Sequence, residues 1–143
     1  MSAPILAPAA MLVFWSMVVM FWVMGTRIPA FKKAGVDLTK SAPGGRYQDV
    51  QDAMPDKVNW KSHNYTHLME QPPLFYAVVV ILAVAGDTST LNTNLAWAYC
   101  GLRVVHSIWQ GMVNTIPVRF GLFLLSSLCL LALAINAVRL TAF

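Results

Sequence analysis

Four stretches of the chain carry enough apolar positions in a row to cross a lipid bilayer as helices. The first extends from about Ile5 to Thr26, the third from about Leu95 to Val113 and the fourth from Val118 to Leu140. The second is continuously apolar only from Pro72 to Ala85, and it becomes long enough when its helix begins near residues 59–63. Because a spanning helix needs about 20 residues, the pattern predicts four membrane spans.

Polar segments connect these stretches. Residues 86–94 and 114–117 form short turns, and Pro117 is well placed to begin the fourth helix. The long connection, residues 27–58, holds the basic residues Arg27, Lys32, Lys33, Lys40, Arg46 and Lys57. Since basic loops remain in the cytoplasm, we expect the loop 27–58 to be cytoplasmic and both termini to lie on the opposite side. The predicted fold is all-α, a four-transmembrane-helix bundle with residues 1–143 as one domain.

Composition agrees with a membrane protein. The chain is 57% hydrophobic and only 11% charged, whereas a soluble domain has about 25% charged residues. The net charge of +4 would by itself favour a nucleic-acid partner. However, most basic residues gather in the long loop, so the charge reflects topology and we expect no nucleic acid. Cys100 and Cys129 lie in apolar stretches without the spacing of a metal site, so we expect them to form neither a disulfide nor a metal site.

Ionisable residues interrupt the apolar stretches. Glu70 is the only acid in a predicted span, and Arg103 is the only base in the middle of one. A charge at membrane depth persists when it faces a bundle interior or cavity and has a partner. We therefore expect Glu70 and Arg103 to contact each other, directly or through one ligand or water. Such a pair could simply fix the register of two helices.

Other polar side chains fall at the same depth, which a structural pair alone would not explain. On the second stretch they are spaced i, i+4 and i+7, and on the third i, i+3 and i+7, so each set lies on one helix face. The residues at this level are Arg27, His63, His67, Glu70, Arg103, His106, Gln110 and Arg119.

Two consecutive prolines, Pro72 and Pro73, follow this level on the second stretch. They cannot donate hydrogen bonds to the carbonyls of Leu68 and Met69, so they predict a kink. Free carbonyls at membrane depth favour a cavity lined by protein. A kink that serves only packing is an equal alternative.

Three segments bring these features together. They are Glu70-Gln-Pro-Pro-Leu-Phe-Tyr, Ala96-Trp-Ala-Tyr-Cys-Gly-Leu-Arg103-Val-Val-His106-Ser and Arg119-Phe. With the four-span layout, they resemble the MAPEG family, the membrane-associated proteins in eicosanoid and glutathione metabolism. The resemblance implies a homotrimer of four-helix subunits, with glutathione bound between neighbouring subunits near the cytoplasmic side.

The resemblance also implies roles for individual residues. Glu70 matches the glutamate that holds the amino end of glutathione, and Arg103 matches the arginine paired with it. His106 matches a polar histidine three residues further on. Arg119 matches the arginine that stabilises the thiolate, and Arg27 matches a basic residue at the end of the first helix.

The sequence departs from the family pattern at four positions. Thr66 and His67 replace an Arg-Asn pair that precedes the glutamate in many glutathione-using members, and Gln110 and Phe123 stand where tyrosine hydroxyls are expected. The expected catalytic residues are Arg103 and Arg119, and the expected glutathione-binding residues are Arg27, His67, Glu70, Arg103, His106 and Gln110.

Three functions remain open on these grounds. The first is an enzyme similar to microsomal glutathione transferases, which conjugates or reduces lipophilic electrophiles or peroxides that arrive from the bilayer. The second is a non-catalytic membrane protein that retains the MAPEG fold. The third, a haem or metal binder, rests on His63, His67 and His106.

Overall fold

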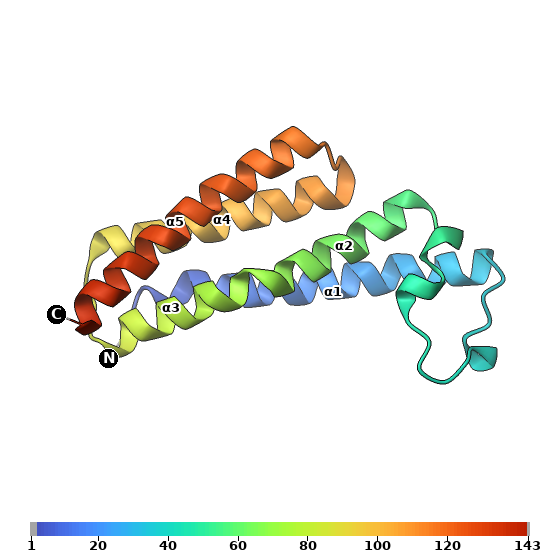
Figure 1. The fold of residues 1–143 in the computed structure, drawn as a ribbon, viewed down its shortest axis with the longest axis horizontal. Coiled ribbons are helices and arrows are strands. Elements are labelled where there is room, and N and C mark those ends of the chain that lie inside the picture. Colours follow the sequence, from blue (N-terminus) through green and yellow to red (C-terminus); the bar gives the residue numbers. More distant parts are fainter. Residues whose placement is uncertain (1–2, 143) are drawn as a thin grey trace.

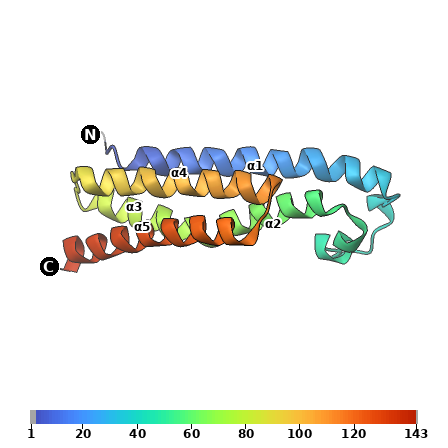
Figure 2. The same ribbon diagram turned by 90° about the horizontal axis from the view of Figure 1, so that it is seen from above.

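The computed structural model, which describes residues 3–142, consists of helices that lie side by side along one long axis (Figure 1 and Figure 2). Only Gln71 separates the second α-helix from the third, so the two form one long rod. The described residues contain no strand, which confirms the all-α prediction. The α-helices are α1 (Leu6–Lys33), α2 (Asp56–Glu70), α3 (Pro72–Val84), α4 (Thr90–Met112) and α5 (Ile116–Ala142).

Three helical rods are long and apolar enough to cross a membrane. They are α1, the combined α2–α3 rod and α5. The remaining helix, α4, has 23 residues. At 1.5 Å per residue it is about 35 Å long, which suffices for a hydrocarbon core about 30 Å thick. α4 is less apolar because it carries several polar side chains that are buried against the other helices, namely Asn92, Arg103, His106, Ser107 and Gln110.

Helix extends further than the four predicted spans. α1 continues to Lys33 and α2 begins at Asp56, so both ends of the predicted loop are helical. α4 begins at Thr90, because the Ser89 hydroxyl accepts a hydrogen bond from the Asn92 N–H and caps the helix. The remaining connection holds three short 3-10 helices, η1 (Leu38–Lys40), η2 (Tyr47–Asp49) and η3 (Gln51–Ala53).

The break between α2 and α3 falls at the predicted kink. Pro72 and Pro73 have no N–H to donate one turn back, and α2 ends directly before Gln71. The Gln71 side chain ties the break to the rest of the bundle. Its Nε2 donates to Ser127 Oγ at 2.8 Å, and its Oε1 accepts from the Tyr99 hydroxyl at 3.2 Å.

The largest apolar core lies toward the termini. There Leu12, Phe75, Tyr99 and Leu133 belong to one buried cluster, and the Phe75 and Tyr99 rings stack with centroids 4.2 Å apart. The start of α1 and the end of α5 lie at this end of the bundle, and the long loop lies at the other end (Figure 1 and Figure 2). The buried polar residues of α2 and of the second half of α4 therefore lie on the loop side of the core.

Candidate functional site

The centre of the polar region is Arg103, a charged α4 side chain with 0% exposure. Its Nη2 donates to the His67 carbonyl at 2.9 Å and lies 3.1 Å from His67 Nδ1. In an unbroken helix the Gln71 N–H would serve this carbonyl, but Gln71 lies at the break. The guanidinium therefore supplies a donor where the helix is interrupted. Its Nε and Nη1 have no hydrogen-bond partner within residues 3–142.

Glu70 does not pair directly with Arg103. All ion pairs found in the described part of the chain lie in the loop between α1 and α2, and Glu70 is exposed on α2. The reason is that Arg103 meets α2 one turn earlier, where the His67 carbonyl accepts its hydrogen bond. Of the two predicted forms of contact, the direct one is thus absent, and contact through a ligand or water stays a prediction.

Two histidines from different helices stack beside Arg103. The rings of His67 and His106 have centroids 4.8 Å apart with an interplanar angle of 20°. The Phe123 ring from α5 meets His67 edge-on at 5.4 Å. The predicted juxtaposition of α2 and α4 at this depth is therefore confirmed, with His67 and His106 in direct contact.

Four of the expected glutathione-binding residues line one cavity of about 380 Å³, which we call the polar cavity. They are Arg27, His67, Glu70 and Gln110, and the loop residue Tyr47 contributes a further wall. Arg27 is held in place by its Nη2, which donates to Ser62 Oγ at 2.7 Å, and by the Tyr47 ring, whose centroid lies 3.8 Å from the guanidinium carbon. The cavity thus gathers a cation, a carboxylate and an amide.

A smaller cavity of about 150 Å³, which we call the aromatic cavity, is also bordered by His67. It is lined by His67, His106, Ile116, Arg119, Phe120 and Phe123. Arg119 Nη1 donates to Asn114 Oδ1 at 2.6 Å, which fixes the guanidinium at the start of α5. His67 lines both cavities, whereas Arg103 lines neither and contacts His67 through Nδ1 of its ring and its carbonyl oxygen.

Comparison with protein families matches residues 5–139 to the MAPEG family. The chain belongs to the MAPEG family. No curated protein and no solved structure matches it. Family membership, together with the three apolar rods, establishes an integral membrane protein. The resemblance in the sequence is thereby confirmed.

The histidines of this MAPEG protein are poorly arranged for haem or a metal ion. A ring nitrogen binds metal through a lone pair in the ring plane, at about 2.0–2.1 Å for zinc. The rings of His67 and His106 face each other, so their lone pairs do not converge, and His63 is exposed. Within the described residues, no three His, Cys, Asp or Glu side chains form a metal-type group.

Sequence reasoning missed a network that holds the MAPEG site together. Ser107 Oγ accepts hydrogen bonds from Trp15 Nε1 at 3.0 Å and from Asn64 Nδ2 at 2.9 Å. This hydroxyl therefore joins α1, α2 and α4 one turn from Arg103. Asn64, which is 0% exposed, was the available signal, because a polar amide three residues before His67 extends the same helix face.

Proposed function

We propose that this protein binds glutathione in the polar cavity and activates its thiol toward lipophilic electrophiles or peroxides. The observation that carries the proposal is the shared wall at His67. The polar cavity holds groups suited to the ends of a charged peptide, and in the aromatic cavity Arg119 lies among aromatic rings. A bound molecule that passes His67 would place its sulfur beside a cation in an apolar setting.

The chemistry follows from the charges. Glu70 would hold the amino group of glutathione, and Arg27 and Gln110 would bind its carboxylates, since arginine forms strong charge-assisted hydrogen bonds with such groups. A free thiol has a pKa of about 8.5, and a nearby cation lowers it. Arg119 would supply that cation. In this arrangement Arg103 acts mainly by positioning His67 and by adding positive potential behind it.

Two reactions fit such a thiolate. In conjugation, the sulfur attacks an electrophilic carbon, a carbon–sulfur bond forms and the leaving group departs with its electron pair. In peroxide reduction, two glutathione molecules supply two electrons, the oxygen–oxygen bond breaks, and the products are an alcohol, water and glutathione disulfide. The Phe120 and Phe123 rings would receive the lipophilic partner from the bilayer.

We also propose that the functional unit is a homotrimer with the long loop in the cytoplasm. His63, Thr66 and Glu70 are exposed on α2 of the single chain. Polar groups at membrane depth are costly when they face lipid, and a neighbouring subunit would cover them. Glutathione would then lie between subunits, as in related MAPEG proteins.

The alternative is a MAPEG-fold protein without catalysis, and one observation favours it. Phe123 lines the aromatic cavity and meets His67 edge-on, at a position where the family resemblance implies a tyrosine hydroxyl. Without that hydroxyl, the thiolate would have one stabilising donor fewer.

Titration of the purified protein with glutathione distinguishes the two functions. We expect saturating glutathione to raise the unfolding temperature and to produce thiolate absorbance in the ultraviolet. S-methylglutathione, which has no ionisable thiol, should stabilise the protein without this absorbance. Arg119→Ala should raise the pKa of the bound thiol and slow conjugation at least tenfold while binding is retained, because Arg119 does not line the polar cavity that would hold the ends of the peptide. Absence of both stabilisation and thiolate would leave the non-catalytic function.

A further inference from the structure

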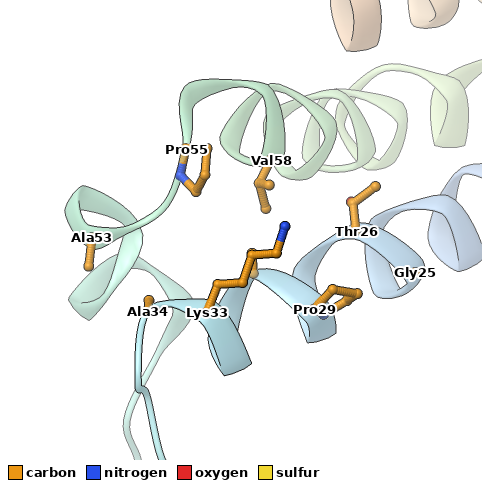
Figure 3. A pocket seen from close by; sticks show the side chains of 9 residues that line it. Gly25, Thr26, Pro29, Lys33, Ala34, Ala53, Pro55 and Val58 are labelled. Atoms are coloured by element: carbon orange, nitrogen blue, oxygen red, sulfur yellow. The ribbon is translucent and has the colours of Figure 1, made fainter.

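A third cavity of about 470 Å³ separates the end of α1 from the beginning of α2 (Figure 3). We call it the interfacial groove. It shares no residue with the polar or the aromatic cavity, so what it holds is independent of the proposed thiol chemistry. Its walls are mostly small and apolar, with Gly25, Pro29 and Ala30 on α1, Ala34 directly after it, and Ala53, Pro55 and Val58 opposite.

The ammonium group of Lys33 lies within this apolar groove. The Lys33 side chain extends from α1 toward Val58, into the space between the two helices (Figure 3). Among residues 3–142, no carboxylate forms an ion pair with Lys33. A second ammonium, that of Lys61 on α2, lies 5.2 Å from the centroid of the Trp22 ring. Trp22 lies one turn before Thr26, which lines the groove, so positive charge is present near both ends.

The depth of the groove corresponds to the boundary between lipid tails and headgroups. The apolar stretch of α1 ends near Thr26, and Lys33 follows two turns later, about 10 Å further along the axis. Tryptophan and lysine are typical of this boundary, where lysine keeps its alkyl chain on apolar surface and its charge near the headgroups. In both views α1 and α2 extend past the α4–α5 turn, so the groove lies at the margin of the bundle (Figure 1 and Figure 2).

We propose that the interfacial groove binds one anionic phospholipid of the surrounding bilayer. The phosphate would lie beside the Lys33 ammonium, and an acyl chain would follow the wall formed by Gly25, Thr26 and Pro29 toward the membrane core. Apolar walls with an unpaired cation are complementary to a molecule with an apolar chain and an anionic head. Basic pockets between helices at a membrane surface bind lipid headgroups in this way.

Native mass spectrometry of the whole protein tests the headgroup contact. Lipid is titrated as phosphatidylglycerol or as phosphatidylcholine with the same acyl chains. We expect phosphatidylglycerol to bind more tightly, and Lys33→Gln to weaken it about fivefold, which corresponds to about 1 kcal/mol. Affinity for phosphatidylcholine should not change. Lys32→Gln is the matched control. It removes the same charge from the neighbouring residue, which does not line the groove.

A second variant tests the acyl-chain contact without removing charge. A Cβ atom added at Gly25 meets no atom within 4 Å, and the same holds for Gly101 on α4. Gly25→Leu should fill the groove, so the protein should no longer retain one phosphatidylglycerol molecule in the mass spectrum. The Gly101→Leu variant should still retain it. Equal affinities for Lys33→Gln and Lys32→Gln, or no preference for phosphatidylglycerol, would overturn the proposal. If oleate displaces phosphatidylglycerol and depends on Lys33 in the same way, the occupant is a fatty acid and the phospholipid assignment is wrong.

Discussion

A buried arginine sets the chemistry of this bundle at the scale of single residues. Arg103 Nη2 donates a hydrogen bond to the His67 carbonyl. Its other two nitrogens, Nε and Nη1, have no hydrogen-bond partner within the described chain. Buried donors without acceptors cost about 1–3 kcal/mol each. Arg103 is therefore a weak source of stability in itself, and its main structural contribution is the position of His67 between the two cavities.

Paired substitutions of Arg103 separate charge from volume. Arg103→Ala should lower the free energy of unfolding by about 3 kcal/mol, because it leaves a cavity and removes the donor from the His67 carbonyl. Arg103→Met keeps most of the volume and removes the unsatisfied donors, so its loss should stay below about 1.5 kcal/mol. Thermal unfolding followed by circular dichroism measures both. Equal losses would show that the charge, and not the volume, governs stability at this position.

Close approach between α1 and α4 governs the bundle at the scale of elements. A Cβ added at Gly111 would lie 2.8 Å from Trp22 Cη2 and 2.9 Å from Cζ3. The glycine therefore allows the indole to lie against the α4 backbone. The Lys61 ammonium faces the Trp22 ring, so this contact also connects α4 to the beginning of α2.

Two alanine substitutions in α4 should have opposite effects. Gly111→Ala should lower the free energy of unfolding by about 1–2 kcal/mol, because the indole has to move. Gly101→Ala, where the added atom meets nothing within 4 Å, should raise stability by about 0.5–1 kcal/mol through helix propensity. Chemical denaturation of both variants in the same detergent gives the comparison. A gain in stability for Gly111→Ala would show that the contact with Trp22 is loose.

Apolar runs and prolines predicted the elements well, because length, caps and missing N–H groups are local properties. The depth at which His67, Arg103 and His106 meet was also predictable, since topology and helical rise fix it. Rotation of a helix about its own axis is not local. His67 and Glu70 share a face of α2, and only the packing of the whole bundle decided that Arg103 meets His67. The two cavities have no sequence signal of their own, because loop residues such as Tyr47 complete one of them.

The distribution of exposed side chains matters at the scale of the whole molecule. Large apolar residues such as Phe14, Phe21, Leu128 and Leu131 are 54–65% exposed on α1 and α5, which suits contact with lipid. The exposed polar face of α2 does not suit lipid, and a neighbouring subunit in the proposed homotrimer would cover it.

Native mass spectrometry in a mild detergent should accordingly report three copies of the chain. Glutathione should make the trimer more persistent at raised collision energy, since a ligand between subunits binds the assembled state only. S-methylglutathione serves as a control for effects of the free thiol. A monomer or a dimer under these conditions would contradict the proposed assembly.

The inward polar face of α4 has a consequence for how the protein enters the membrane. An arginine at the centre of a helix opposes insertion by about 2.5–3.5 kcal/mol, and α4 also carries asparagine, histidine and glutamine. α5 is strongly apolar, and Asn136 on α5 donates to Asn92 on α4 at 2.6 Å. We infer that α4 enters as a hairpin with α5, after α1 and the α2–α3 rod have provided hydrogen-bond partners for its polar side, namely Trp15, Asn64 and His67. The low hydrophobicity of α4 thus determines the order in which the helices enter the bilayer.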